Sequence, residues 1–164
     1  MWKKLKAGTL IAIPGDNDQY LVGQILIPGI TFYMQVHDLW VHDLSDCYKA
    51  LESPILLFGE TTDGDLCREK WKVCGEAPCP SRFFQPYHAV NSPDGLVVCD
   101  FNKTVVRQAN SEDFDRYGFK TSVSSPVFSN AVTEYAKQGI EADLGCIDAQ
   151  LVACRSELQL KSST

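Results

Sequence analysis

The first part of the chain alternates apolar runs with turn residues, which predicts a β-hairpin. Residues 8–14 and 19–27 are mostly apolar, and the Gly-Asp-Asn-Asp of residues 15–18 is typical of a turn. In the second run the apolar alternation shifts phase at Gly23, which is what a glycine bulge or coil in a highly curved small barrel would produce. Residues 30–41 are rich in β-branched and aromatic side chains and predict a third strand.

The residues after this third strand predict shorter elements. Ser45 is the expected cap of a short helix through Leu51, which Pro54 prevents from continuing. The apolar run at 55–58 then predicts a buried strand.

Two Asp-Gly pairs, at residues 63–64 and 94–95, predict turns in the middle of the chain. Strands are expected on either side of them, at 66–73, 96–101 and 104–107. Between these strands, residues 75–93 contain four prolines and are expected to be largely irregular. Residues 111–120 are expected to form an acidic, aromatic-bearing connector.

The clearest helical pattern begins at Ser125, the expected N-cap, with Pro126 at the first helical position. Gly139 stands where a helix C-terminus favours a left-handed residue. One face of this helix is apolar and comprises Val127, Phe128, Ala131, Val132, Tyr135 and Ala136. Residues 140–158 also follow helical spacing, but Gly145 weakens a helix and 147–153 could alternate as a strand, so both alternatives stay open.

These elements predict one α+β domain over residues 1–164, with a disordered tail at 161–164. We expect an N-terminal, strongly curved antiparallel sheet, an SH3-like partial barrel, packed with one or two C-terminal helices. A chain of 164 residues can bury a core large enough to fold without staples.

The net charge of the chain limits the classes of partner that it is expected to bind. With 21 acidic and 15 basic residues, the net charge of −6 argues against a surface for nucleic acid or anionic membrane. Lys3, Lys4 and Lys6 could belong to a signal peptide, but the apolar run at 7–13 that follows is too short for one. We therefore expect a cytoplasmic protein, and the odd number of cysteines, seven, indicates reduced thiols.

The sequence contains few residues whose spacing is typical of a catalytic or metal site. Cys67, Cys74, Cys79 and His88 could supply a zinc site, but they lack the paired knuckle spacing, and free thiols are the better interpretation. Cys99 with His88 is a generic nucleophile and base pair that no motif marks out. No nucleophile elbow, phosphate-binding glycine loop or H-E-x-x-H motif is present. We therefore predict no enzymatic activity, no metal and no cofactor.

The tetrapeptide Val-His-Asp-Leu occurs twice, at residues 36–39 and 41–44. Residues five apart in a strand point to opposite faces, so His37 and His42 are not expected to share a metal. The functional interpretation is an acidic, aromatic recognition edge. The alternative is a strand end with solvated carboxylates around a core tryptophan. The residues concerned are Asp38, Trp40, Asp43 and Asp46.

Several blocks of the sequence together resemble the immunity protein 26 family of bacterial polymorphic toxin systems. The first block is G-x-L-I-A-I-P at residues 8–14, followed by an Asp-rich turn and the run at 19–26. Later blocks follow in the same order within residues 8–138: Trp71-x-Val73-x-Gly75-x-x-Pro78-x-Pro80, Phe84-x-Pro86-Tyr87, Tyr117-Gly118 and Ser125-Pro126. The cysteines and the repeated tetrapeptide lie outside this pattern.

The resemblance implies a cytosolic antidote that binds a cognate protein toxin and blocks it without performing chemistry. The acidic charge fits a toxin with a basic face, such as a nuclease. For the toxin-binding residues, we predict the third strand and its exit, with two more positions on the following turn. They are Tyr33, Asp38, Trp40, Asp43, Asp46, Asp63 and Asp65.

Two other functions stay open at this point. The first is a β-barrel module that binds a small molecule or peptide and has no toxin partner; a ligand-sized apolar cavity would favour it. The second is a cysteine-dependent or metal-dependent enzyme, which stoichiometric zinc in the purified protein would favour. Neither the toxin's identity nor the oligomeric state follows from the sequence.

Overall fold

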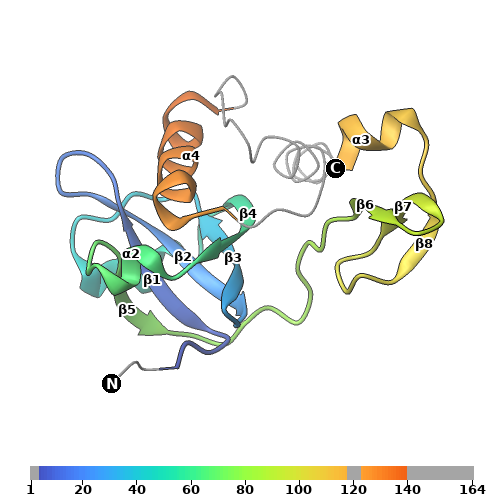
Figure 1. Cartoon of the computed structure of the whole chain (residues 1–164). Helices are drawn as coiled ribbons and strands as arrows, with labels where there is room; N and C mark the ends of the chain where they lie inside the picture. Colours follow the sequence, from blue (N-terminus) through green and yellow to red (C-terminus); the bar gives the residue numbers. More distant parts are fainter. Residues whose placement is uncertain (1–3, 118–122, 140–164) are drawn as a thin grey trace. The chain divides into compact units, whose positions relative to one another are not determined.

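The computed structural model describes residues 4–117 and 123–139, and it has a mixed α+β architecture with two antiparallel sheets (Figure 1). The expected α+β class is confirmed. Two compact units are present among the described residues: 4–81 with 123–139, and 82–117. Compactness does not establish that either unit folds by itself, so the single-domain expectation stays a prediction. The ambiguous element at 140–158 and the tail at 161–164 lie outside the described residues.

The first unit contains a five-stranded sheet with the order β4-β3-β2-β1-β5. Every neighbouring pair in it is antiparallel. The sheet is open, with β4 and β5 at its two edges, so it is not a closed barrel. Its strands are β1 (Thr9–Pro14), β2 (Tyr20–Ile27), β3 (Thr31–His37), β4 (Ile55–Thr62) and β5 (Lys72–Glu76).

The predicted β1–β2 hairpin is confirmed. Its turn is closed by the Gly15 N–H, which donates to the Gln19 carbonyl at 2.8 Å. Asn17 and Asp18 adopt left-handed backbone conformations, with φ of 59° and 53°, which Asn and Asp tolerate better than most residues.

The predicted bulge at Gly23 is wrong. Gly23 pairs regularly with Ile11 and Val36, and the register shift between β2 and β3 falls between Ile25 and Ile27. Gly23 is needed for another reason, because a Cβ there would lie 2.6 Å from the Met34 Sδ atom. The phase shift seen in the sequence arises because β2 is buried on both faces, so apolar residues occupy either face.

The predicted third strand is shorter than expected, because β3 ends at His37. The chain then leaves the sheet, and only Val41 returns, as an isolated bridge to Tyr20. The short helix predicted next is present as η1 (Leu44–Asp46) and α1 (Cys47–Ala50). The proposed Ser45 cap is wrong: the Asp43 carboxylate caps the segment by accepting the Ser45 N–H at 2.8 Å.

Residues 66–73 do not form the expected strand over their whole length. Gly64–Cys67 is a helical turn, α2, and β5 begins only at Lys72. The Asp65 carbonyl accepts the N–H groups of Lys70 and Trp71, at 2.9 and 3.1 Å, and this folds the chain back on itself. Trp71 is thereby directed into the core, where it is 2% exposed.

The C-terminal helix α4 (Ser125–Gln138) is confirmed, together with its end at Gly139, where φ is +65°. The N-cap is Ser124, one residue before the predicted one. Ser125 is buried, and its hydroxyl accepts the Asp65 N–H at 2.7 Å, which fixes α2 against the start of α4. No helix among the described residues has the length and apolar character needed to cross a membrane.

The second unit contains β6 (His88–Ser92), β7 (Gly95–Cys99), β8 (Val105–Gln108) and α3 (Ser111–Tyr117). Its sheet has the order β6-β7-β8, and the predicted Asp-Gly turn at 94–95 joins β6 to β7. The expected irregular segment at 75–93 is wrong for residues 88–92, and the expected connector at 111–120 is helical up to Tyr117. Arg107 and Asp113 form a bidentate ion pair with both distances at 2.6 Å, which ties β8 to α3.

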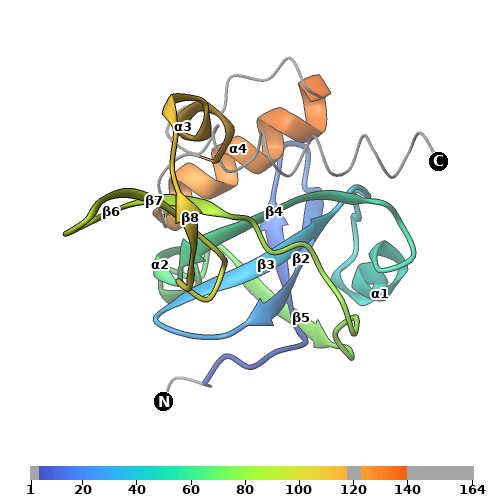
Figure 2. The same cartoon turned by 90° about the vertical axis from the view of Figure 1, so that its right-hand side faces the viewer.

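Both faces of the five-stranded sheet are covered, because β1 and β2 are buried at almost every position. Leu10 and Ile11 are adjacent in β1 and therefore point to opposite faces. Leu10 belongs to a cluster that includes Cys47 and Ala50 of α1. The opposite face is covered by α4, and the turned view shows the two helices on different sides of the sheet (Figure 2).

On the α4 face, Phe128 lies over Gly59 of β4. A Cβ on Gly59 would lie 2.5 Å from the Phe128 ring, so the ring occupies the space that a side chain would take. Phe128 also meets Trp71 edge to face at 6.1 Å between centroids, and the Trp71 indole N–H donates to the Ser129 hydroxyl at 2.8 Å. These contacts join β4, α4 and the residue that precedes β5.

We expect Phe128→Ala to lower the free energy of unfolding by about 3–5 kcal/mol, because it leaves a cavity between Gly59 and Trp71. The matched control is Val127→Ala on the same helix, where the side chain is 39% exposed. That change should cost less than about 1 kcal/mol. Urea unfolding followed by circular dichroism measures both, and equal losses would contradict the assigned packing.

On the α1 face, a chain of buried polar side chains links three segments. Gln24 Nε2 donates to the carbonyls of Ala77 and Pro78, both at 3.1 Å, and Gln35 Nε2 donates to Gln24 Oε1 at 2.9 Å. Gln35 Nε2 also lies 3.3 Å from Nε2 of His37, which is 2% exposed. With Gln35 as the donor, His37 accepts at Nε2 and is neutral. Burial, the largest cause, lowers the pKa of His37.

This lowered pKa predicts a loss of stability in mild acid. Below the ordinary histidine pKa of about 6.5 the unfolded chain binds a proton that folded His37 does not, so stability falls as the pH falls toward the folded pKa. The slope per proton approaches about 1.4 kcal/mol per pH unit. His37→Gln should remove this component, whereas His42→Gln, at an exposed residue, should not. Urea unfolding between about pH 5 and pH 8 tests it, and identical pH profiles for wild type and His37→Gln would count against it.

Candidate functional site

Trp40 joins two surface turns at one end of the five-stranded sheet. Its half-buried indole lies against Gly15, because a Cβ on Gly15 would lie 2.2 and 2.4 Å from ring atoms Cζ3 and Cη2. Next to it, Tyr20 and Val41 exchange two backbone hydrogen bonds of 2.8 and 2.9 Å. The β1–β2 turn and the loop after β3 are therefore held side by side.

Both of these turns carry carboxylates, and we call the resulting surface the acidic end. It comprises Trp40 and the carboxylates of these two turns and of the short helix that follows: Asp16, Asp18, Asp38, Asp43 and Asp46. Lys137 of α4 pairs with Asp16 at 2.5 Å, and Lys49 pairs with Asp46 at 2.8 Å. Asp38 and Asp43 are exposed to solvent. The negative charge of the acidic end is thus only partly balanced by these two lysines.

Hydrogen bonding keeps part of this charge in place over a wide pH range. The Ser45 backbone N–H and then the Ser45 hydroxyl lower the pKa of Asp43, so this carboxylate stays ionised well into acid. The same carboxylate caps η1, which fixes its position relative to the helix. The acidic end therefore presents an ordered negative group rather than a freely moving one.

Four of the seven predicted binding residues lie in the segment that follows β3 and belong to the acidic end as defined above: Asp38, Trp40, Asp43 and Asp46. Tyr33 is 4% exposed and stacks on Phe58 with centroids 6.2 Å apart, so it has little surface to offer a partner. Asp65 is 3% exposed. Asp63 follows the end of β4 that pairs with the start of β3. Asp38 follows the other end of β3, so the two residues lie at opposite ends of this strand pair. Three of the predicted residues are therefore not part of this surface.

Sequence reasoning missed Asp16 and Asp18 as members of the acidic end. They were assigned only to the hairpin turn, which is correct locally. The turn that carries them is held against Trp40 through Gly15, whose missing side chain admits the indole ring. Repeated Asp residues in a turn were the available signal, but nothing in the sequence paired that turn with residues 38–46.

Among the residues that the structure describes, histidine and cysteine side chains do not converge with the acidic end on a metal site. His37 is buried and His42 is exposed, so the two do not share a site. Within residues 4–117 and 123–139, no group of three or more His, Cys, Asp or Glu side chains is placed to hold a metal ion. The described cysteines, Cys47, Cys67, Cys74, Cys79 and Cys99, carry free thiols, and Cys146 and Cys154 lie outside the described residues.

Cys47 and Cys74 illustrate the chemistry of the buried thiols. The Cys47 thiol donates to the Cys74 carbonyl at 3.2 Å. Burial and then the hydrogen bond with Cys47 raise the pKa of the Cys74 thiol to about 12. A thiol that stays protonated at neutral pH is a poor nucleophile, since the thiolate is the reactive form. These contacts support a packing role for this pair.

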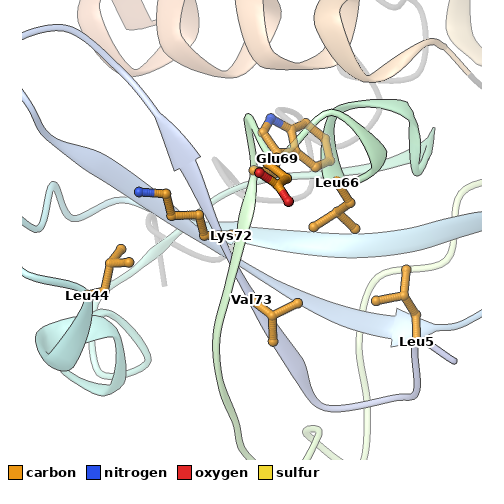
Figure 3. Close-up of a pocket in the computed structure, with 7 residues that line it drawn as sticks. Leu5, Leu44, Leu66, Glu69, Lys72 and Val73 are labelled. Carbon is orange, nitrogen blue, oxygen red and sulfur yellow. The ribbon is translucent and has the colours of Figure 1, made fainter. Parts of the chain in front are cut away.

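A second surface feature lies along β5, and we call it the β5 groove. Its volume is about 550 Å³, and it is lined by Leu5, Leu44, Leu66, Glu69, Trp71, Lys72 and Val73. Leu44 and Lys72 lie on one side of the strand, with Val73, Leu66 and Leu5 on the other (Figure 3). Most of this lining is apolar, and its volume falls within the range of ligand pockets, about 300–1,000 Å³.

Comparison with known proteins adds no further constraint on these two surfaces. No protein-family model matches the chain, and no curated protein or solved structure matches it. The resemblance to the immunity protein 26 family therefore rests on the order of the sequence blocks alone. The acidic end and the β5 groove are the features from which function has to be argued.

We expect Gly15→Ala to destabilise the protein by about 1–3 kcal/mol, because the new methyl group displaces the Trp40 ring. In a Trp40→Ala background the same change should cost little, or even stabilise slightly by restricting the unfolded chain. A double-mutant cycle measured by urea unfolding reports the difference. Additive effects of the two substitutions would contradict a direct contact between Gly15 and Trp40.

Proposed function

We propose that this protein is an immunity protein that binds a bacterial toxin and neutralises it by direct, non-catalytic contact. The observation that carries the proposal is the contact of the Trp40 indole with Gly15, which holds two acidic turns side by side. Large aromatic residues and charged groups are the usual anchors of tight protein interfaces. The acidic end supplies both kinds within one small area.

The partner that best fits the acidic end is a toxin with a basic face, such as a nuclease. Negative charge on one protein and positive charge on the other speeds association and selects against partners of the wrong charge. Ser45 lowers the pKa of Asp43 below its ordinary value, so this carboxylate keeps its charge in more acidic solution than an ordinary aspartate does. The half-buried Trp40 indole offers an apolar contact in the same loop as Asp38 and Asp43.

The resemblance to the immunity protein 26 family supports the same proposal, because it also implies a non-catalytic antidote that acts in the cytoplasm. The finer fold that we expect, an SH3-like partial barrel, belongs to the proposal as well. Its support is the antiparallel order of β1, β2 and β3 and the register shift between Ile25 and Ile27, since bulges increase strand bending.

The β5 groove supports a second candidate function, the binding of a peptide or small molecule. An apolar groove of about 550 Å³ is large enough for a ligand. This function requires no toxin, and it uses a different set of residues from the acidic end. The two candidates can therefore be tested separately in the same protein.

The toxin proposal predicts that co-expression protects a host from the product of the gene directly upstream, and that the two proteins purify as a complex. Asp38→Lys combined with Asp43→Asn should weaken that complex about tenfold or more, and more strongly at low salt, because it removes negative charge from the interface. Asparagine at residue 43 keeps the oxygen that caps η1. Isothermal titration calorimetry measures the affinity.

The control for this test is Asp94→Lys, an exposed carboxylate in the β6–β7 turn of the second unit. It should leave the affinity for the toxin unchanged. Survival of the host no better than without this protein would contradict the proposed function. An intact complex with unchanged affinity in the double variant would leave the toxin proposal standing but would exclude the acidic end as its interface.

A further inference from the structure

The two edge strands of the five-stranded sheet, β4 and β5, differ in what covers their outer edges. At the C-terminal end of β4 the edge is covered, because Thr61 forms a parallel bridge with Val123 and its hydroxyl donates to the Val123 carbonyl at 2.9 Å. At β5 no further strand pairs with the outer edge among the described residues. An edge strand with open backbone groups is a ready template for an added strand.

Part of the β5 edge is nevertheless covered by α1. The Tyr48 hydroxyl accepts the Glu76 N–H at 3.4 Å, and the Cys47 thiol donates to the Cys74 carbonyl at 3.2 Å. These contacts occupy the C-terminal half of the strand. The β5 groove lies at the other half, beside Lys72 and Val73, where Val73 is 55% exposed. The open part of the edge and the apolar groove therefore coincide.

The shape of the groove suits an extended chain. Successive side chains of a strand point to opposite sides, so a peptide laid along β5 would direct alternate residues to the two sides of that strand. The groove offers Leu44 on one side of β5 and Leu5, Leu66 and Val73 on the other (Figure 3). A peptide with apolar residues can thus bury side chains on either side while its backbone pairs with the edge.

The charge around the groove is opposite to that of the whole chain. Five exposed cationic residues line the groove or stand next to its lining residues in the sequence, against three exposed acidic residues, Asp43, Glu69 and, at the end of β5, Glu76. The cationic residues are Lys4, Lys6, Arg68, Lys70 and Lys72. Lys6 is paired with Glu76 at 2.8 Å, and Arg68 approaches Asp65 at 3.8 Å. The chain as a whole carries a net charge of −6, so a locally basic rim favours an acidic occupant.

We propose that the β5 groove binds an extended, acidic segment of a partner protein, which adds to the open half of β5 and buries apolar side chains between Leu44, Leu66 and Val73. This inference rests on the second candidate function and specifies its ligand as a peptide of defined charge. It is independent of the toxin proposal, because the acidic end would attract a partner of the opposite charge.

The experiment uses the full chain and two fluorescent synthetic peptides of about ten residues, long enough to cross the groove and to pair with the open residues Lys72 and Val73. Both peptides carry the same leucine and valine residues, and the remaining positions are glutamate in one and lysine in the other. Fluorescence anisotropy should show binding of the glutamate peptide and much weaker binding of the lysine peptide. Equal or stronger binding of the lysine peptide would overturn the inference.

Substitutions locate the binding to the groove. Val73→Glu should weaken the binding of the glutamate peptide about tenfold or more, because it places a carboxylate on the apolar lining. The matched control is Val105→Glu on β8, where the side chain is 58% exposed, and it should have no effect. As a second variant, Lys70→Glu, which stands between the lining residues Glu69 and Trp71, should weaken binding more than Arg82→Glu, which changes the net charge equally in the second unit. Equal effects of the paired variants would overturn the inference, and thermal unfolding confirms that each is folded.

Two further outcomes separate this inference from the function on which it rests. If neither peptide binds but the apolar dye ANS binds and Val73→Glu abolishes its fluorescence, the groove takes small apolar ligands and the peptide inference is wrong. If size-exclusion chromatography shows a dimer that Val73→Glu dissociates, the occupant is a second copy of this chain and the inference is again wrong. If the dye does not bind either, the second candidate function fails with it.

Discussion

Aromatic rings that occupy the space above glycines connect the short elements of this protein to its sheet. Trp40 lies against Gly15, Phe128 against Gly59, and the Tyr48 hydroxyl against Gly75. In each case a Cβ on the glycine would come within 2.6 Å of the aromatic side chain. Distances of that size leave no room for another residue, so each contact requires both partners. The loop after β3, helix α4 and helix α1 are positioned by these contacts.

The two candidate surfaces follow from this arrangement. The Trp40 contact brings the β1–β2 turn to the loop after β3 and so creates the acidic end. The Phe128 contact, through Trp71, fixes the residue that directly precedes β5 and therefore the wall of the β5 groove. Tyr48 limits the groove on the other side, because it covers the Glu76 end of the strand. The surface chemistry thus depends on core packing a few residues away.

The sequence predicts the locally determined elements well. The β1–β2 hairpin and helix α4 were expected close to their observed bounds, because turn residues, Pro126 and Gly139 act on their immediate neighbours. The sequence does not predict the helical turn α2, whose position depends on distant contacts. The strand expected at 66–73 yields to α2 because Asp65 is fixed by Ser125, sixty residues later, and Trp71 is directed into the core. The same dependence on distant contacts explains the errors in the predicted site. Tyr33 is buried in the sheet, and the turn that carries Asp16 meets Trp40 only because Gly15 admits the indole ring.

The opposite charges of the two surfaces show why net charge is a poor guide to the partner of this protein. A chain at −6 would be expected to repel an acidic ligand, yet the screening length at physiological salt is only about 8 Å, so a bound segment responds mainly to the nearest side chains. Around the β5 groove those are mostly lysines and Arg68, and around Trp40 they are mostly aspartates. Two partners of opposite charge could therefore select different faces of this small protein. The charge of each binding segment, rather than that of the whole partner, would decide which face it meets.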